Sequence, residues 1–238
     1  MHAVDGFTQT FPQRDFKLTQ PKYLTNNWRM IQASEEYTSL KSTSIKATQG
    51  VINVVSDGLI VRNYVGSGLD DGYYRISGEG VLVPSANDAA VYNNFDDLDA
   101  AKPDFAYVKK TPPIPQSEIR RFVDFLGFVR NADYVSKSKR HIVCSRQSFL
   151  NTDNPGQELF FGFDMPVNSP LLFDAHLLKL AFTEALRYDH IYIGFDAREL
   201  NEKRGSPMII GLDWGNCVIV AARRSMTEEE REWIISRA

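Results

Sequence analysis

Few residues in this sequence have the types and spacing that nucleophilic or metal chemistry requires. His141 and Cys144 are close enough in the chain to suggest a thiol nucleophile with its base. Three residues apart on a strand, they point to opposite faces, which favours a structural role. His176 and His190 have no cysteine or carboxylate at ligand spacing, and Cys217 belongs to no C-x-x-C pair. The sequence therefore predicts neither a thiol enzyme nor a zinc site.

Acidic residues gather in two stretches that could hold a divalent cation. The residues concerned are Asp70, Asp71, Asp96, Asp97 and Asp99. Both stretches have the polar composition of solvated turns, so we expect turns in preference to a calcium or magnesium site. No glycine-rich loop of the kind that cradles phosphates precedes a helix. We therefore predict no metal and no cofactor.

Asp213 is a sharper candidate, because it lies in the stretch Ile209–Asn216 (IIGLDWGN). This stretch resembles the first-strand motif of ribonuclease-H-like nucleases and actin-like ATPases, in which an Asp at the strand end binds metal or approaches phosphates. Such chemistry needs further carboxylates on later strands, and only residues 217–238 follow here. We favour a tight turn between two strands. A metal-dependent nuclease that uses Asp213 remains the alternative.

The bulk composition limits the function further. The chain has 238 residues, 43% of them hydrophobic and 24% charged, which suits one large domain or two ordinary ones. A net charge of −3 means that any contact with nucleic acid needs cations concentrated on one face. The first residues show no signal-peptide pattern, and no apolar run approaches the ~20 residues that span a bilayer. We expect a cytoplasmic protein without membrane contact.

The first half of the chain has the pattern of an antiparallel meander over residues 42–84. Short β-branched runs alternate there with turn residues, including Asp57-Gly58, which is a strong hairpin signal. Three prolines between Thr111 and Pro115 then predict a stiff extended connector. We place a domain boundary there, between residues 1–111 and residues 112–238.

The second half alternates between helical and strand periodicity. Its predicted helices are 116–129, with an apolar stripe that includes Phe122 and Leu126, 173–188, and a terminal helix at 227–237 that opens with the capping box Thr227-x-x-Glu230. Its predicted strands are 140–146, 158–164, 190–195, and a hairpin of 206–212 with 217–223. The predicted fold class is therefore α+β.

Basic residues lie outside the apolar stripes of the two longer helices. Lys179, Thr183 and Arg187 are spaced four apart, which predicts an outward row on one helix. The other cations belong to the earlier helix and the segment after it: Arg120, Arg121, Arg130, Lys137, Lys139 and Arg140. Two such helix faces could present cations to the phosphates of a nucleic acid. Ordinary solvated helix faces would show the same spacing, so both interpretations stay open.

The order of elements in the second half resembles a known family. The matching phrases are Pro115–Val129, Phe173–Phe182 (FDAHLLKLAF), Asp189–Phe195 (DHIYIGF), Ser206–Ile210 (SPMII) and Val218–Arg223 (VIVAAR). Over residues 113–224 they resemble a domain of a DNA sliding clamp of the bacterial polymerase III β type. The resemblance implies two clamp-like domains, each an antiparallel sheet backed by two helices. The helix Thr227–Arg237 is outside the family pattern.

The resemblance also implies a function without catalysis. A clamp is a ring that encircles duplex DNA without reading its sequence and tethers a polymerase after a clamp loader has placed it. The length of this chain suits two domains, hence a homotrimer, as in a phage or mobile element. Partners would insert apolar peptides into an outer pocket, for which the candidates are Phe105, Tyr107, Val108, Met208 and Ile210. A clamp-fold interaction protein that does not encircle DNA is a further alternative.

Overall fold

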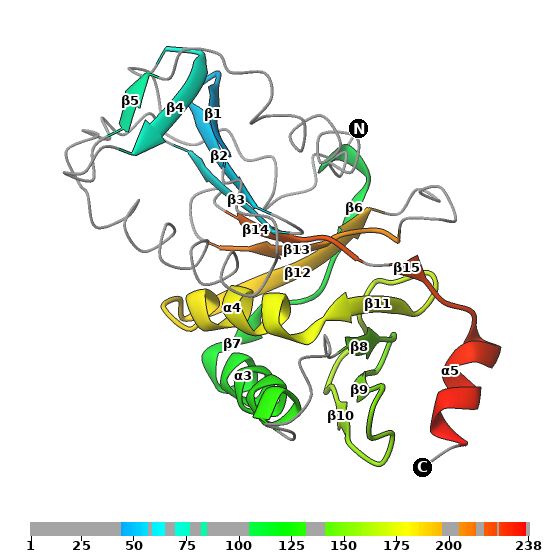
Figure 1. Cartoon of the computed structure of the whole chain (residues 1–238). Coiled ribbons are helices and arrows are strands. Elements are labelled where there is room, and N and C mark those ends of the chain that lie inside the picture. The colour runs from blue at the N-terminus through cyan, green and yellow to red at the C-terminus, as the bar shows by residue number, and fades with distance from the viewer. Residues whose placement is uncertain are drawn as a thin grey trace.

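Antiparallel sheets and a small number of helices make up the computed structural model of the chain (Figure 1). The residues that the structure describes are 44–56, 59–64, 70–76, 82–84, 105–131, 141–196, 205–212, 217–222 and 224–236. The fold class is α+β with antiparallel sheets, as predicted. The two helices expected for residues 1–111 fall outside the described residues.

The described elements divide at the proline-rich connector. Before it lie β1 (Ser44–Thr48), β2 (Val51–Ser56), β3 (Leu59–Tyr64), β4 (Gly72–Ile76), β5 (Leu82–Pro84), the 3-10 helix η2 (Phe105–Tyr107) and β6 (Val108–Lys110). From its end onward lie β7 (Ile114–Pro115), α3 (Gln116–Asn131), β8 (His141–Cys144), β9 (Ser148–Asn151), β10 (Glu158–Phe160), β11 (Leu171–Asp174), α4 (Ala175–Ala185), β12 (His190–Asp196), β13 (Met208–Gly211), β14 (Cys217–Val220), β15 (Arg224–Ser225) and α5 (Glu228–Ile235).

The strands of residues 42–84 are antiparallel as predicted, but they do not form a simple meander. β1, β2 and β3 follow one another across the sheet, whereas β4 pairs with β1, with Ile45 opposite Tyr74. The reason is that the far edge of β3 is already occupied, because β14 pairs with it and places Ile219 opposite Ile60. β4 therefore uses the remaining edge, and β5 extends the sheet beyond it.

The chain from β7 to β14 consists of two units of the same topology. Unit one is β7, α3, β8, β9 and β10, and unit two is β11, α4, β12, β13 and β14. In each unit a strand leads directly into a helix, and three antiparallel strands follow. The leading strand of each unit pairs with the first of the three strands of the other unit, β7 with β12 and β11 with β8.

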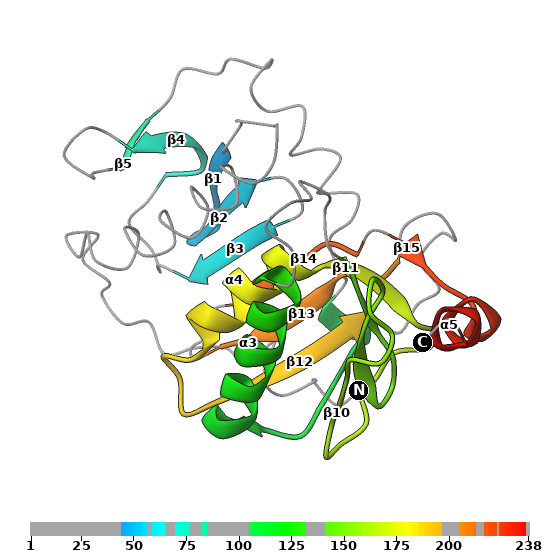
Figure 2. The same cartoon turned by 60° about the horizontal axis from the view of Figure 1, so that its bottom comes forward.

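The register makes this exchange symmetric. Pro115, the last residue of β7, lies opposite His190, the first residue of β12. Asp174, the last residue of β11, lies opposite His141, the first residue of β8. The two units are thus related by an internal two-fold arrangement, and the two helices begin at corresponding points. Figure 2 shows α3 and α4 lying beside one another.

One hydrophobic core joins the two units. The helices bury Phe122 and Leu126 from α3 and Leu178 and Phe182 from α4. Phe122 makes edge contacts with the rings of Phe149, Phe161 and Phe182, at centroid distances of 5.5, 5.6 and 5.2 Å. The inner faces of both sheets complete the cluster, and the ring of Phe149 in β9 contacts Phe122 and Phe182, so the core is continuous across the two units.

Several element boundaries differ from the prediction. The helix predicted over 173–188 is shorter, because Asp174 is extended and caps α4, its Oδ1 accepting hydrogen bonds from the amides of His176 and Leu177 at 2.9 and 3.4 Å. The strand predicted over 158–164 ends at Phe160. β9 lies in what was predicted as a loop, since Phe149 and Leu150 are buried on opposite faces of the sheet. The capping box of Thr227 and Glu230 is confirmed.

The proline-rich connector runs along β12. β6 and β7, on its two sides, both pair with that strand, and the amide of Thr111 donates to Ile193 O at 2.8 Å between them. The side chain of Thr111 in turn accepts a hydrogen bond from the Ile193 amide. The connector is therefore extended, as three prolines require. The domain boundary at residues 111 and 112 stays a prediction.

Candidate nucleic-acid interface

α3 positions its cations by burying the opposite face. Ile119, Phe122, Leu126 and Val129 have no exposed surface and recur at helical spacing. The start of the helix is fixed to the end of α4, since the Gln116 side chain donates to Leu186 O at 2.7 Å. With the apolar stripe held inward, Arg120, Arg121 and Asp124 are exposed, as the sequence predicted for this face.

α4 is buried over most of its length, which leaves a narrow exposed row. Lys179 is half-buried, while Thr183 and Arg187 are exposed, so the predicted row does face outward. The Thr183 hydroxyl donates to Lys179 O at 2.7 Å, which uses its hydrogen within the helix. Arg187 lies just beyond the last residue of α4.

Lys179 lies where the two helices meet. A Cβ added to Gly127 of α3 would be 3.2 Å from Lys179 Nζ and 3.5 Å from its Cε. The aliphatic part of the lysine therefore extends over α3, and its ammonium group lies at the junction of the two helices. Arg120 and Lys179 make no ion pair within the described part of the chain, so their charges are available to a ligand.

Two other cations of this surface already have carboxylate partners. Arg121 pairs with Glu118 at 2.8 Å, and Arg187 pairs with Glu184 at 3.4 Å. Arg121 also donates to Phe160 O at 3.5 Å. A phosphate could bind these arginines only by sharing them with the carboxylates, so Arg120 and Lys179 are the stronger candidates. The i, i+3 spacing of both pairs was visible in the sequence, but its meaning depends on which face is exposed.

The carboxyl group of Glu184 is largely buried in the helix pair, where an ionised form is unfavourable. Its side chain is only 10% exposed, and this burial raises the pKa of the carboxyl group, while the nearby Arg187 opposes the shift. In its ionised form the carboxylate subtracts one charge from the cationic helix surface. The surface formed by Arg120, Arg121, Lys179 and Arg187, with Glu118, Asp124 and Glu184 among them, is therefore only modestly positive.

The remaining predicted cations are not brought into this surface by the described structure. Arg130 belongs to α3, and only its backbone is described. Lys137, Lys139 and Arg140 lie outside the described residues. Their contact with DNA stays a prediction.

The predicted partner pocket has members of two kinds. Met208 and Ile210 are fully buried in the hydrophobic core, and Val108 is 2% exposed. Tyr107 is 54% exposed, whereas the side chain of Phe105 is not described. β13 is enclosed between β12 and β14, which explains why an apolar run there is core. The pocket stays a prediction, and Tyr107 is its exposed member in the described structure.

The structure gives His141 and Cys144 structural positions. Cys144 points into the core and is fully buried, and burial raises the pKa of its thiol. His141 lies on the opposite face of β8, since side chains alternate along a strand. Among the described residues there is no group of three or more His, Cys, Asp or Glu that could hold a metal ion. Asp213 lies outside the described residues, so its role in a nuclease stays a hypothesis.

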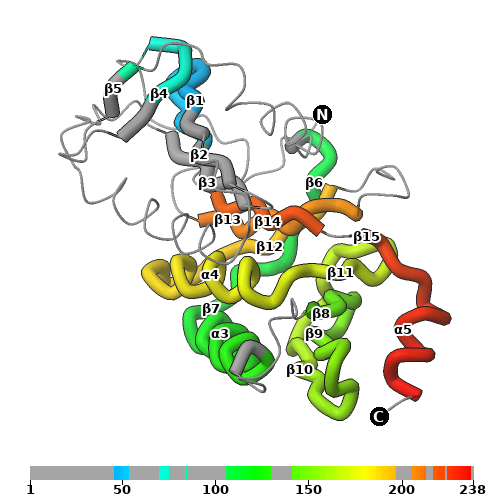
Figure 3. The backbone as a smooth tube through the Cα atoms, in the orientation of Figure 1, coloured from blue at the N-terminus to red at the C-terminus, as the bar shows by residue number. Residues whose placement is uncertain are grey.

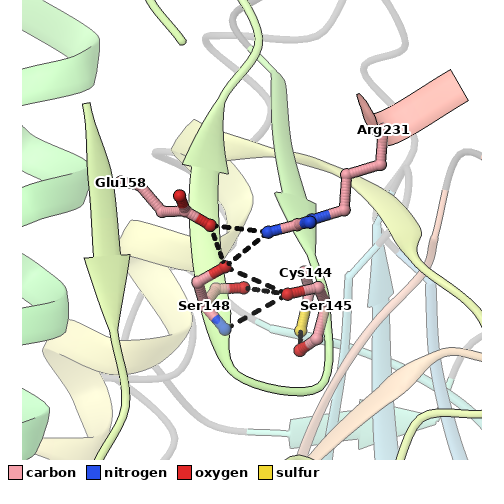
Figure 4. Close-up of polar contacts among 5 residues, drawn as sticks. All are labelled: Cys144, Ser145, Ser148, Glu158 and Arg231. Atoms are coloured by element: carbon pink, nitrogen blue, oxygen red, sulfur yellow. Dashed lines mark hydrogen bonds and ion pairs between the residues drawn. The ribbon is translucent and has the colours of Figure 1, made fainter. Parts of the chain in front are cut away.

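A buried polar cluster in the small sheet was not predicted. It consists of Ser145, Ser148, Glu158 and Arg231, beside Cys144 (Figure 4). Arg231 comes from α5, far along the chain from Glu158, with which it forms an ion pair at 2.7 Å. No spacing in the sequence connects these residues, because only the docking of α5 brings them together.

Comparison with known proteins finds no matching family model and no matching curated protein. Solved structures do resemble the chain. A chain described as a DNA polymerase III β subunit from Eubacterium rectale shares 12% identity at a TM-score of 0.49, over 91% of this chain and 67% of that one. The DNA polymerase III β subunit from Thermotoga maritima shares 13% identity at a TM-score of 0.47, over 93% and 69%. A β clamp from H. pylori, in complex with 5-chloroisatin, shares 8% identity at a TM-score of 0.44, over 90% and 68%.

These structures are of the protein type that residues 113–224 resemble in sequence. Identities of this order and TM-scores below 0.5 do not carry a function to this chain. Separately, none of the described helices has the length and apolar character needed to cross a membrane.

Proposed function

We propose that the chain is a sliding-clamp-like processivity factor. As a ring of identical subunits, a trimer, it encircles duplex DNA without reading the sequence and tethers a DNA polymerase, with a clamp loader as a second partner. The protein is cytoplasmic and performs no catalysis itself. A phage or mobile element is the proposed source.

The observation that carries this proposal is the pair of helices α3 and α4. They come from two units related by an internal two-fold arrangement, and both turn their polar sides outward while the sheets pack behind them. Arg120 and Lys179 expose charges that no carboxylate of the described residues neutralises. Cations on a smooth helical surface suit phosphate contacts that position a duplex but read no bases.

The whole-chain charge supports the same function. With a net charge of −3, the protein does not attract DNA over its entire surface. A modest cationic surface between helices binds weakly enough to slide, because each phosphate contact can be exchanged for the next one. A strongly basic surface would hold the duplex in place.

The test is charge reversal on the helix pair. Arg120→Glu and Lys179→Glu, singly and together, are expected to weaken binding to duplex DNA of mixed sequence. The slope of log K against log salt is negative, and each phosphate contact that is lost should reduce its magnitude by about 0.9. Binding can be measured by fluorescence anisotropy over a series of salt concentrations.

Arg146→Glu is the matched control, because Arg146 is exposed in the turn between β8 and β9 and pairs with Asp164 at 2.8 Å. It changes the net charge by the same amount as each single variant. If Lys179→Glu weakens binding no more than Arg146→Glu does, the helix faces are merely solvated. The chain would then be a clamp-fold interaction protein that does not encircle DNA.

A further inference from the structure

The C-terminal residues 224–236 form a strap across the outer face of the small sheet. β15 pairs with β11, and the Met226 amide donates to Pro170 O at 2.8 Å. α5 follows and lies on the side of the sheet opposite α3 (Figures 1 and 3). The strap therefore covers a face that the main core does not use.

The covered face is a single row of residues across the sheet. In register from strand to strand, the row runs Glu158, Leu150, Val143 and Leu172, which we call the strap face. Met226, Ile234 and Ile235 of the strap pack on its apolar members. Three aliphatic side chains beside a carboxylate thus meet two isoleucines, a methionine and an arginine.

An ion pair fixes the strap at the Glu158 end of this row. Arg231 pairs with Glu158 at 2.7 Å, with only 19% and 17% of the two side chains exposed. At the other end the strap is held by backbone pairing, with Arg224 of β15 opposite Leu172, while the ion pair of Arg224 with Glu230 at 2.9 Å lies within the strap and joins β15 to α5. The strap is therefore tied to the sheet by one ion pair and by the pairing of β15 with β11.

The polar cluster below Arg231 makes the contact specific. The Ser148 hydroxyl donates to Glu158, so its oxygen accepts the hydrogen bond from the Ser145 hydroxyl at 3.0 Å (Figure 4). Removing Arg231 would leave the largely buried Glu158 carboxylate without its counter-charge, which is costly. The strap face therefore favours an occupant that carries an arginine at this position.

The helical part of the strap is nevertheless held weakly. None of the residues of α5 is buried, in contrast to α4, and Trp233 is 58% exposed. A helix of this length has little stability of its own in water. Arg231 Nε also has no hydrogen-bond partner among the described residues, so the anchor is incomplete. The strap contributes no residue to the main core, because Met226, Ile234 and Ile235 belong to a separate small cluster.

We propose that the strap is displaceable, and that the strap face is a docking site which also accepts the strap of a second copy of this chain. The occupant is defined by its chemistry: a short capped helix with two adjacent aliphatic side chains and an arginine that reaches Glu158. The inference does not depend on DNA binding, since it concerns the side of the small sheet opposite α3.

The experiment measures binding of a fluorescent peptide, residues 223–238, to the full-length chain without DNA. In wild type the resident strap competes, so the apparent affinity is reduced by the fraction of chains whose face is open. Arg231→Ala in the protein weakens the resident strap and leaves the strap face intact. The peptide, which keeps Arg231, should therefore bind this variant about tenfold or more tightly than wild type.

Two controls distinguish docking of the peptide on the strap face from simple fraying of the C-terminal helix. A peptide that carries Arg231→Ala should lose the gain, and adding Glu158→Gln to the Arg231→Ala protein should abolish it. In wild type, amide hydrogens of α5 should exchange before those of α4. Absence of peptide binding to the Arg231→Ala protein, or exchange in α5 as slow as in α4, would overturn the proposal.

Discussion

The two units of the second half share one topology but differ in how the last strand of each is paired and buried. In unit two, β14 (CVIV) is buried throughout and pairs on its far side with β3 of the first half. In unit one, no residue of β10 (ELF) is fully buried, and within the described structure this strand pairs with β9 alone. The same position in a repeated architecture is thus a sheet interior in one unit and a sheet edge in the other.

The two strands differ in side-chain composition as well as in pairing. Apolar residues on both faces of β14 need cover on both faces, and pairing with β13 and β3 satisfies the backbone groups along its two edges. β10 buries only Leu159 against the core, while Phe160 is 60% exposed and Glu158 is used by the strap. An edge strand with one exposed aromatic residue can remain open or pair with another chain.

The largest effect is expected where the two units share their core. Phe122→Ala should lower the free energy of unfolding by about 3–5 kcal/mol, because the ring contacts Phe149 and Phe161 of unit one and Phe182 of unit two. Urea unfolding monitored by circular dichroism measures this. Phe160→Ala removes the same ring from the open edge and should change stability by about 0.5 kcal/mol or less. Equal losses in the two variants would contradict the contrast between core and edge.

The sequence predicted those elements whose signal is local. The apolar stripe of α3, the capping box of α5 and the turn-separated strands of the first half all depend on residues a few positions apart, and these were confirmed. The resemblance over 113–224 predicted two helices on antiparallel sheet, and the fold class agrees.

Other features depend on which distant strands pair, and no local pattern encodes that. β4 was expected to follow β3, but β14 occupies that edge. Met208 and Ile210 were assigned to a surface pocket because they are apolar, although strands on both sides of β13 make them core. The cation row was predicted, whereas the carboxylates that neutralise Arg121 and Arg187 were overlooked.

A smaller effect is expected from Glu184, which belongs to unit two and has no counterpart in the apolar stripe of α3. Its raised pKa means that the folded state holds the proton more tightly than the unfolded state does. This contribution to stability is fully present below the unfolded pKa and is lost as the pH rises through the folded pKa. Glu184→Gln, which removes the charge at similar size, should therefore gain stability over wild type as the pH rises from 4 to 8.

Urea unfolding at several pH values measures this gain. Glu118→Gln is the control, since Glu118 forms the corresponding i, i+3 pair with Arg121 on the more exposed side of α3. That pair should contribute about 0–1 kcal/mol, and its loss should not stabilise the protein. If Glu184→Gln is less stable than wild type at pH 7, the ion pair with Arg187 outweighs the cost of burial.

The smallest effect on stability, with the largest on assembly, is expected at the open edge of unit one. If β10 of one subunit pairs with a neighbouring subunit, as β14 pairs with β3 within the chain, Phe160 lies in the contact between subunits. Phe160→Lys should then convert the proposed trimer to monomer in light scattering, since a lysine on an edge strand opposes pairing. The free energy of unfolding of the monomer should change by only about 0.5 kcal/mol.

Tyr107→Lys is the control, because Tyr107 is similarly exposed but lies next to β6, in the large sheet. It should leave the mass of the assembly unchanged. A trimer that persists with Phe160→Lys would mean that subunits meet elsewhere, and a wild-type monomer at high concentration would count against the ring itself. Phe160 directly precedes Phe161, whose ring packs on Phe122 in the core. A loss of mass in Phe160→Lys can therefore be assigned to the edge strand only if the free energy of unfolding is retained, since unfolding of unit one would also disrupt the assembly.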